Sequence, residues 1–534
     1  MKHVKRFLAL SLAAALLAGC VSCGNSDEKT SPTGGGSGVD STGDGGTLRI
    51  AMTCAALPNT DSEPTEGQEG YRFVSFQLYD ALVKWDASSE TEAGKIIPGL
   101  ATSWEQNPEN PKRWTFHLRE GVTFSNGTPF NADSVLANFD RMKKGPFESS
   151  FYGMNIDTIY PGLVSYEKTD DYTVVLTLSE GQPLLDYTMV NYGSAIFEPS
   201  CFAEDGTFAG FPIGTGPYKH VEWKRGDSLE FEMFEDYWDE EHMPSIKHMI
   251  WKIIPEGSSR TIALEAGEVD YIVDVEAMDV ERLEAADGIK LDKIAATNHM
   301  WMMVNNEVPG LDNVDVRRAM NCAINKEDVV QVALNNLGTP SYSMAPDNMP
   351  GATDENTLPY DPEKAKEYMA ASGVDPADVK FSIICSNDQK KRAGEVVQAN
   401  LKEVLGIECE IESMDLATYL TVTSEGNYTA AIGNYSATDM IQYLVGVYHT
   451  KSIGASNRTR LNSPEVDALI DKAAATIDPD ERAEVLSECI AQINDLCPQV
   501  PLYQDMHMRA YNENLGGVIM YPGGTLYMHA MYWK

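Results

Sequence analysis

The residue types that most often do chemistry are present in this chain but form no catalytic pattern. Its 534 residues include nine histidines, none of them in the HExxH spacing that holds a zinc ion on one face of a helix. Neither a GxxxxGKS/T phosphate-binding loop nor a GxSxG nucleophile turn occurs. The 80 Asp and Glu residues offer no spacing that singles out an acid and a base. The sequence therefore predicts no enzyme activity and no bound cofactor, with a surface hydrolase as the remote alternative.

Soft-metal ligands gather near the C-terminus. Met and His alternate over residues 506–508 and recur over 528–531, a set that could ligate a soft metal ion. Methionine also fills irregular core space, which explains the same residues without a metal, and we expect no metal site. Apart from Cys20 and Cys23, the seven remaining cysteines contain no CxxC pair and no zinc spacing. Most of those beyond residue 46 are expected to be buried as small apolar side chains, and their disulfide state stays open.

The N-terminus has the features of a targeting segment. Basic residues at positions 2, 5 and 6 precede an apolar run over residues 7–19. This run is too short to span a bilayer as a stable helix, so the pattern predicts a signal peptide over residues 1–19.

The end of that run carries a first resemblance. Residues 17–20 read Leu-Ala-Gly-Cys and resemble a bacterial lipoprotein box, which implies a lipid on Cys20. An ordinary secretory signal with a chance cysteine is the alternative. The segment over residues 20–46 is rich in Gly, Ser and Thr, a composition that predicts a flexible tether. No other stretch is apolar for long enough to cross a membrane, so the lipid would be the only anchor.

Net charge excludes one class of partner. The chain has 41 Lys and Arg residues against 80 Asp and Glu, a formal net charge of −39. Charge of this sign repels phosphate backbones, and no basic stripe stands out. We therefore exclude nucleic acid as a partner.

Beyond residue 46, short β-type runs alternate with amphipathic segments, which predicts a mixed α/β fold of several folding units. The pattern predicts strands over residues 47–52, 114–118, 171–178, 381–385 and 407–412. Helices are expected over residues 71–83, 315–334, 361–372, 391–405, 463–475 and 479–494, with another beginning near 131 and an extended segment from 501 onward.

Several short motifs resemble one protein family. They lie at residues 78–83, 98–101, 103–105, 114–124, 126–130, 214–218, 236–238, 267–270, 316–319, 360–365 and 501–503. Together, and in this order, they closely resemble family 5 extracellular solute-binding proteins of ABC importers. Physically most are scaffold: the Asn126-Gly127 pair suits a turn with positive φ, and Trp104, Trp114 and Trp238 are most simply core anchors.

The resemblance implies a two-lobed, periplasmic-binding-protein-like fold of type II, in the large cluster with an extra subdomain. Residues 47–297 would form the N-terminal lobe, with the subdomain at about 86–210. The C-terminal lobe would comprise residues 298–505. Residues 506–534 would return to the first lobe, and the lobes would close around a ligand.

The resemblance also implies where a ligand would lie. Peptide-binding members hold an extended ligand as an added strand, so that main-chain hydrogen bonds supply affinity. The two segments that correspond here follow the first strand and the apolar strand at 430–432. The ligand-binding candidates are Thr53, Cys54, Ala55, Ala56, Leu57, Gly433, Asn434, Tyr435, Ser436 and Ala437.

Two further candidates keep alternative interpretations. Peptide-binding members show a Trp-x-x-Asp pattern whose aspartate pairs with the ligand's ammonium group. Here Tyr435 holds the aromatic position and Asp439 follows four residues later, so the alignment needs a gap. Asp439 would bind a cationic group or cap the helix that follows it. Trp301 would stack on the ligand or belong to the core or the hinge.

The function that follows is that of a receptor. We expect a monomer outside the cytoplasm, lipid-anchored to a bacterial cell membrane, that captures short peptides for the permease and ATPase of an ABC importer. The same class of receptor binding an oligosaccharide, another polar solute or a metal chelate is the alternative.

Overall fold

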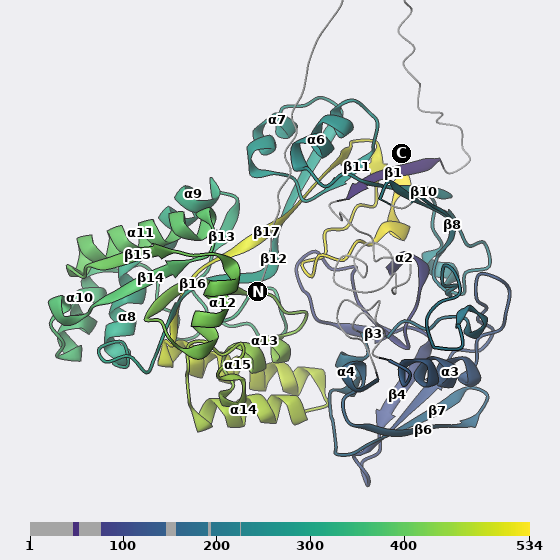
Figure 1. Cartoon of the computed structure of the whole chain (residues 1–534), viewed down its shortest axis with the longest axis horizontal. Coiled ribbons are helices and arrows are strands. Elements are labelled where there is room, and N and C mark those ends of the chain that lie inside the picture. The colour runs from purple at the N-terminus through teal and green to yellow at the C-terminus, as the bar shows by residue number, and fades with distance from the viewer. Residues whose placement is uncertain (1–45, 53–75, 146–155, 191–193, 225) are drawn as a thin grey trace, which may run out of the picture. The chain divides into compact units, whose positions relative to one another are not determined.

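The computed structural model describes the whole chain except residues 1–45, 53–75, 146–155, 191–193 and 225 (Figure 1). Helices and strands alternate along it, which confirms the predicted mixed α/β fold. The largest sheet has the strand order β15-β14-β16-β12-β17-β11-β1-β10-β9-β8, and β13 also pairs with β17.

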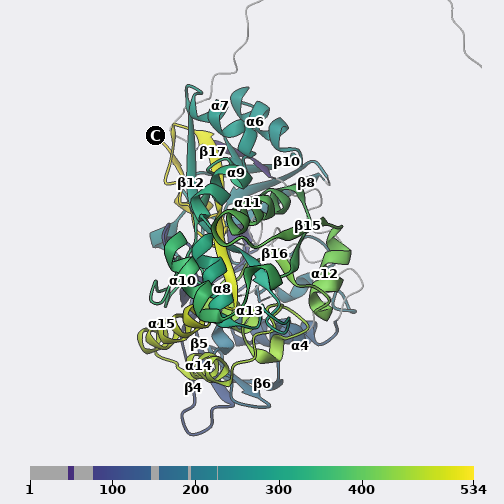
Figure 2. The ribbon, with the colours of Figure 1, turned by 90° about the vertical axis from the view of Figure 1, so that its left-hand side faces the viewer.

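Two long strands join the halves of this sheet. β12 (Ile289–Val304) and β17 (Gln499–Asn512) are antiparallel and run side by side in both views (Figures 1 and 2). Their pairing is irregular between Ala295 and His299. On one side of this irregularity the pair continues to β11 and β1, and on the other side β12 pairs with β16. The two strands therefore carry the chain from one group of elements to another and back.

The C-terminal part is built on parallel strands. β14 (Phe381–Cys385) pairs in parallel with β15 (Cys409–Ser413) and with β16 (Ala430–Tyr435). Residues 430–433 are all buried, as expected of a parallel strand covered on both faces. The helices here are α8 Val314–Ala323, α9 Lys326–Leu334, α10 Pro362–Ser372, α11 Asp388–Leu405, α12 Leu416–Glu425, α13 Met440–Val447, α14 Pro464–Ala475 and α15 Pro479–Leu496, with β13 at Gly338–Pro340.

Local capping explains where these helices begin and end. Each begins after Asn, Asp or Ser, whose side chain accepts a hydrogen bond from a first-turn N–H. Asp361 and Pro362 begin α10 as predicted, and α11 ends at Gly406 in a left-handed conformation. Their apolar faces form one core with β12 and the parallel strands, which we call the C-terminal core (residues 300–503).

Among the described residues, the N-terminal part contains four smaller cores and a separate sheet of order β4-β5-β7-β6, on which α3 packs. Its strands are β1 Thr47–Met52, β2 Val83–Trp85, β3 Ile96–Pro98, β4 Ala101–Gln106, β5 Arg113–Leu118, β6 Leu163–Asp170, β7 Thr173–Leu178, β8 Tyr218–Lys224, β9 Ser228–Met233, β10 His248–Ile253 and β11 Tyr271–Val273. Its helices are α2 Phe76–Leu78, α3 Ala132–Met142, α4 Ile156–Ile159, α5 Leu185–Thr188, α6 Gly257–Glu265 and α7 Val280–Glu284. The C-terminal hairpin pairs β18 Leu515–Gly516 with β19 Tyr532–Trp533.

Two predicted helices differ in the structure. The helix expected over residues 71–83 is wrong in its second half, because only α2 is helical in the described part and β2 begins at Val83. The carbonyl of Leu78 accepts a hydrogen bond from Gly216 N–H, and that of Leu82 from Gly99 N–H, so tertiary contacts take the acceptors that a helix needs. The helix expected over 315–334 is two helices, because Asn325 caps α9.

Candidate functional site

The candidate site lies where the parallel strands of the C-terminal part end. β14, β15 and β16 point the same way, and α11, α12 and α13 follow them in turn. Ligands in open α/β sheets bind outside the carboxyl ends of the strands. The predicted segment at 433–437 lies at this edge, and its pairing with β12 ends at Tyr435. The main chain of Ser436 and Ala437 thus continues beyond the last pair of the ladder.

Asn434 is exposed and belongs to a chain of polar contacts that joins α11, β16, β12 and β17. Lys390 Nζ, from the first turn of α11, donates to Asn434 Oδ1 at 3.0 Å. Asn434 Nδ2 donates to Asn298 Oδ1 at 3.0 Å, and Asn298 Nδ2 donates to an oxygen of Asp505. We call Lys390, Asn434, Asn298 and Asp505 the lysine network. Burial raises the pKa of the Asp505 carboxyl, while Asn298 and Lys390 oppose the rise.

Tyr435 and Gly433 are held by close packing. A Cβ at Gly446 of α13 would lie 2.5 Å from the Tyr435 hydroxyl, and one at Gly433 would lie 2.8 Å from Met303 Sδ. The ring centroid of Tyr435 is 6.0 Å from that of Tyr443. Glycine at both positions lets the end of β16 approach its neighbours, which fixes the Tyr435 ring beside the candidate segment.

Asp439 is the N-cap of α13. Its carboxylate accepts from Gln442 N–H at 2.8 Å, the capping geometry that the sequence left as one alternative. Burial raises the pKa of this carboxyl, whereas the helix N–H groups and Arg482 oppose the rise. A cationic group beside Asp439 would, like Arg482, lower the pKa of its carboxyl.

Residues from the N-terminal part meet this segment. A Cβ at Gly94 would lie 3.1 Å from the carbonyl oxygen of Thr438 and 3.4 Å from Cα of Asp439. Gly94 N–H donates to the Tyr521 hydroxyl at 3.1 Å. Nearby, the guanidinium of Arg482, on α15, lies 5.0 Å from the ring centroid of Tyr187 on α5. Arg482 is 7% exposed, and its Nε and Nη1 have no hydrogen-bond partner among the described residues.

The other predicted residues are placed as follows. Thr53, Cys54, Ala55, Ala56, Leu57 and Cys20 lie outside the described residues. Trp301 pairs with Gly433, but its side chain is only 3% exposed and packs edge to face on Tyr443 in the C-terminal core. Its ring therefore supports the site from behind.

Sequence reasoning missed Lys390, Asp505 and Arg482. Lys390 carries a signal that could have found it, since it is the third residue after the cap of a helix that follows a parallel strand. Asp505 and Arg482 carry no such signal, because tertiary packing alone brings them to this edge.

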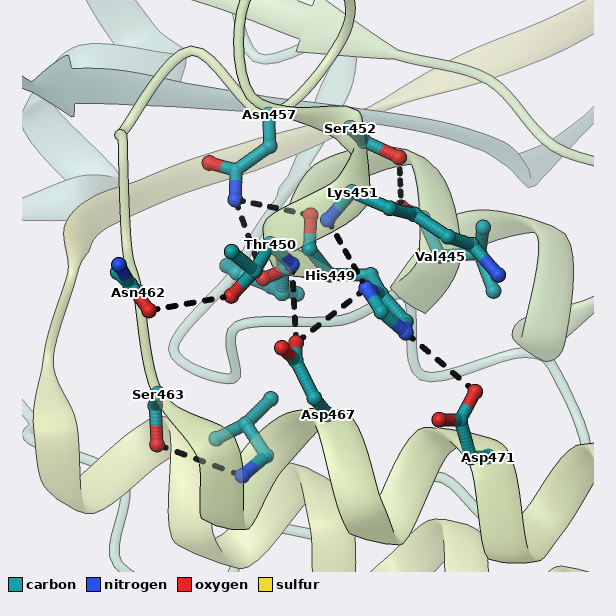
Figure 3. A network of polar contacts seen from close by, with 12 residues as sticks. Val445, His449, Thr450, Lys451, Ser452, Asn457, Asn462, Ser463, Asp467 and Asp471 are labelled. Carbon is teal, nitrogen blue, oxygen red and sulfur yellow. Dashed lines mark hydrogen bonds and ion pairs between the residues drawn. The ribbon is translucent and has the colours of Figure 1, made fainter.

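A histidine between two aspartates invites a metal interpretation. His449 lies beside Asp467 and Asp471 of α14 (Figure 3), with Nε2 3.3 Å from an Asp471 oxygen. Its Nδ1 accepts from Lys451 N–H at 3.1 Å, and Asp467 accepts from Thr450 N–H at 2.9 Å. These groups tie the turn after α13 to α14. Within the described residues, no group of three or more His, Cys, Asp or Glu side chains is arranged to hold a metal ion.

The cysteines match the prediction of burial. All six in the described part beyond residue 52 are buried and free: Cys201, Cys322, Cys385, Cys409, Cys489 and Cys497. Burial raises the pKa of each thiol, to about 11 for Cys322 and about 12 for Cys385. These thiols therefore stay protonated and unreactive at neutral pH.

Comparison with known proteins identifies the class. Residues 95–454 match the family described as "Bacterial extracellular solute-binding proteins, family 5 Middle", so the chain belongs to this family. It is 26% identical to heme-binding protein A of Haemophilus influenzae over 98% of this chain and 97% of that protein. It is 27% identical to the dipeptide-binding protein of Escherichia coli, over 89% and 95%. The structure of HbpA2 from Haemophilus parasuis superposes with a TM-score of 0.80 and 24% identity, over 91% and 100%.

These matches confirm the two-lobed fold of type II periplasmic binding proteins and the receptor class. Members of the family bind solutes outside the cytoplasm for ABC importers and are not enzymes. In the described part of the chain, we find no helix with the length and hydropathy that a bilayer crossing needs.

Proposed function

We propose that this chain is a lipid-anchored receptor that captures short peptides between its two lobes and delivers them to the permease of an ABC importer. The observation that carries the proposal is the end of β16, where Ser436 and Ala437 extend beyond the ladder with β12. An extended peptide placed there would add a strand through main-chain hydrogen bonds. The dipeptide-binding relative supports the same ligand class.

A pair of variants tests main-chain recognition. Ser436→Pro removes the N–H of the exposed residue Ser436, whereas Ser436→Ala keeps it and removes only the hydroxyl. Losing one hydrogen bond of about 1.4 kcal/mol would weaken peptide binding about tenfold. We expect this loss for the proline variant alone, by titration calorimetry with a peptide that co-purifies with the protein. Equal affinities of the two variants would contradict recognition through this N–H.

The receptor class has its own test. Ligand released by denaturing the purified protein, and identified by mass spectrometry, should be peptide. Small-angle scattering should then show compaction when that peptide is added, because closure accompanies binding. Neither compaction nor thermal stabilisation with any of a set of peptides, oligosaccharides and metal chelates would overturn the proposal.

The lobe boundaries are part of the proposal: residues 47–297 and 506–534 in one lobe, with a subdomain at about 86–210, and residues 298–505 in the other. The irregular pairing of β12 between Ala295 and His299 supports them, since it falls at the first boundary. Bending there would disturb few ladder hydrogen bonds.

We also propose a monomer with a lipid on Cys20 and a tether over residues 20–46. The Leu-Ala-Gly-Cys sequence at 17–20 supports the lipid. In a bacterial host, wild-type protein should fractionate with membranes and Cys20→Ser with the soluble fraction. Cys23→Ser is the matched control, since it changes a nearby cysteine outside this sequence. Membrane retention of Cys20→Ser would contradict the anchor.

A further inference from the structure

Two short segments of the N-terminal part contact the C-terminal part, in addition to the strands β12 and β17 that join them. The first is the start of α5, where Leu184 packs against the C-terminal core. Three residues later, the ring centroid of Tyr187 lies 5.0 Å from the guanidinium of Arg482, in the first turn of α15. The second is the loop between β2 and β3, where Ala93 N–H donates to the Asn348 carbonyl at 2.9 Å. We call Leu184, Tyr187 and Arg482 the latch.

Arg482 makes few polar contacts within its own part of the chain. Its Nη2 donates to the Ile477 carbonyl at 2.8 Å, while Nε and Nη1 have no hydrogen-bond partner among the described residues. The side chain is nevertheless buried, so the face of the Tyr187 ring is a favourable neighbour for its charge. Arg482 also opposes the rise that burial causes in the pKa of two carboxyls, Asp186 in the N-terminal part and Asp439 in the C-terminal part. Separating the two parts would therefore take Tyr187 and Asp186 away from this cation.

The N-terminal side of the latch is held in place by its own neighbours. The Tyr187 ring packs edge to face on Trp85, with 6.0 Å between the ring centroids. The Asp186 carboxylate accepts from Trp104 Nε1–H at 2.9 Å and from Tyr187 N–H at 3.0 Å. Because these contacts already fix the ring, little conformational freedom is lost when it meets Arg482.

Every contact of the latch joins two groups of the protein itself, so it can form whether or not a ligand lies between the lobes. We propose that the latch holds most empty receptors with their lobes together and so limits the rate at which they open. This inference rests on the proposed function and adds to it a step that the ligand's chemistry does not control. A contact present in both the empty and the filled closed states stabilises both. Its free energy therefore largely cancels from the affinity, whereas association and dissociation both become slower.

Arg482→Gln tests the latch, because it removes the cation and keeps a polar side chain. The probe is the tightest-binding member of a library of synthetic tetrapeptides, and stopped-flow fluorescence measures its binding to the full chain. We expect association to become about twofold faster or more and dissociation about fivefold faster, with the dissociation constant raised no more than about threefold. By small-angle scattering without peptide, the variant should have a larger radius of gyration than the wild type, and peptide should compact it more.

Faster dissociation with unchanged association and unchanged peptide-free dimensions would overturn the latch, because that result would make Arg482 a ligand contact. Tyr187→Phe keeps the aromatic face and should behave as the wild type, whereas Tyr187→Leu should match Arg482→Gln. If Arg482→Gln fails to fold, the two Tyr187 variants decide, and equal rate constants for them would overturn the latch. The double variant Arg482→Gln/Tyr187→Leu should be no faster than either single variant, since both break one contact.

Arg318→Gln is the matched control for the loss of an arginine from the C-terminal part. Arg318 donates to Asp315 and Asp495 of the same part, so this variant should leave both rate constants and the radius of gyration unchanged.

The outcomes separate this inference from the proposed function. Wild-type rate constants in both Arg482→Gln and Tyr187→Leu would overturn the latch and leave the receptor intact. Absence of peptide binding by the wild type would overturn both.

Discussion

Two polar networks start from neighbouring residues of β12, and one of them reaches the surface whereas the other is buried. Asn298 belongs to the lysine network, whose members reach the surface at Asn434. His299 belongs to a second group with Ser341 and Tyr443, which we call the histidine network. Successive side chains of a strand point to opposite faces, so one strand supplies both networks.

The histidine network is complete. The Tyr443 hydroxyl lies 2.7 Å from His299 Nδ1 and 3.2 Å from the Met344 carbonyl oxygen. The Ser341 hydroxyl lies 2.8 Å from Nε2, so both ring nitrogens have a hydrogen-bond partner. Burial lowers the pKa of His299 to about 3, and the ring stays neutral. The lysine network, in contrast, holds a cation and a carboxyl with hydrogen-bonding capacity to spare. The difference leads us to expect that the histidine network stabilises the fold, whereas the lysine network contributes little to stability in the absence of a ligand.

The largest expected effect is the loss of the His299 ring. His299 is fully buried, so His299→Ala leaves a cavity and deprives Tyr443 and Ser341 of their partner. We expect the free energy of unfolding to fall by about 3 kcal/mol, measured by urea titration without ligand. Asn298→Ala is the matched control on the same strand and should cost less than about 1 kcal/mol. Equal losses would remove the distinction between the networks.

The next effect is a pH dependence. The pKa of His299 is about 3 in the folded protein and about 6.5 in an unfolded chain, so acid protonates the unfolded state first. This group therefore stabilises the fold fully above pH 6.5, and its contribution declines as the pH falls towards 3. The slope approaches about 1.4 kcal/mol per pH unit, so about 2 kcal/mol disappears between pH 6 and 4.

The measurement compares wild type with His299→Gln at several pH values, because the difference isolates this residue. His220 and His529 have pKa values lowered to about 4 and about 3 and contribute equally to both proteins. Parallel stability curves for the two proteins would contradict the buried neutral ring.

The carboxyl of the lysine network should behave in the opposite way. Burial raises the pKa of Asp505, so its charged form destabilises the fold above that pKa and the penalty disappears as the pH falls. Asp505→Asn should therefore raise the ligand-free stability by about 1 kcal/mol at pH 7, with no gain at pH 3. Thermal or urea unfolding at the two pH values measures it. A loss at pH 7 would show that the charge of Asp505 serves the fold.

Much of the scaffold was predictable because its signals are local. The strand at 47–52, the cap at Asp361 and the helix end at Gly406 each follow from a few adjacent residues, and the structure has all three. Asp439 shows the same logic, since its place before an apolar helix predicts capping as readily as ligand binding. The second half of the helix expected over 71–83 is wrong because the carbonyls of Leu78 and Leu82 accept hydrogen bonds from Gly216 and Gly99, which are not helical neighbours.

The site was less predictable because its contacts are distant in sequence. Lys390 and Asn434 are 44 residues apart, and Asn298 and Asp505 are 207 apart. The irregular pairing of β12 with β17 sets which side chains face the end of β16. The spacing of residues along the sequence does not reveal that register. Lys390 and Asp505, which lie near the segment at 433–437, were therefore not predicted.

The smallest expected effect is also the most direct test of the comparison. Asn434 is exposed, so water can replace its contacts to Lys390 and Asn298 after Asn434→Ala. Without ligand, this variant should lose no more than about 0.5 kcal/mol of unfolding free energy. Tyr443→Phe is the counterpart in the histidine network: it removes one hydroxyl where water has no access and should cost about 2 kcal/mol, because His299 Nδ1 loses its buried hydrogen-bond partner. If the lysine network stabilised the fold, urea titrations would give similar losses of unfolding free energy for the two variants. If it does not, Asn434→Ala should leave the unfolding free energy nearly unchanged in the absence of ligand.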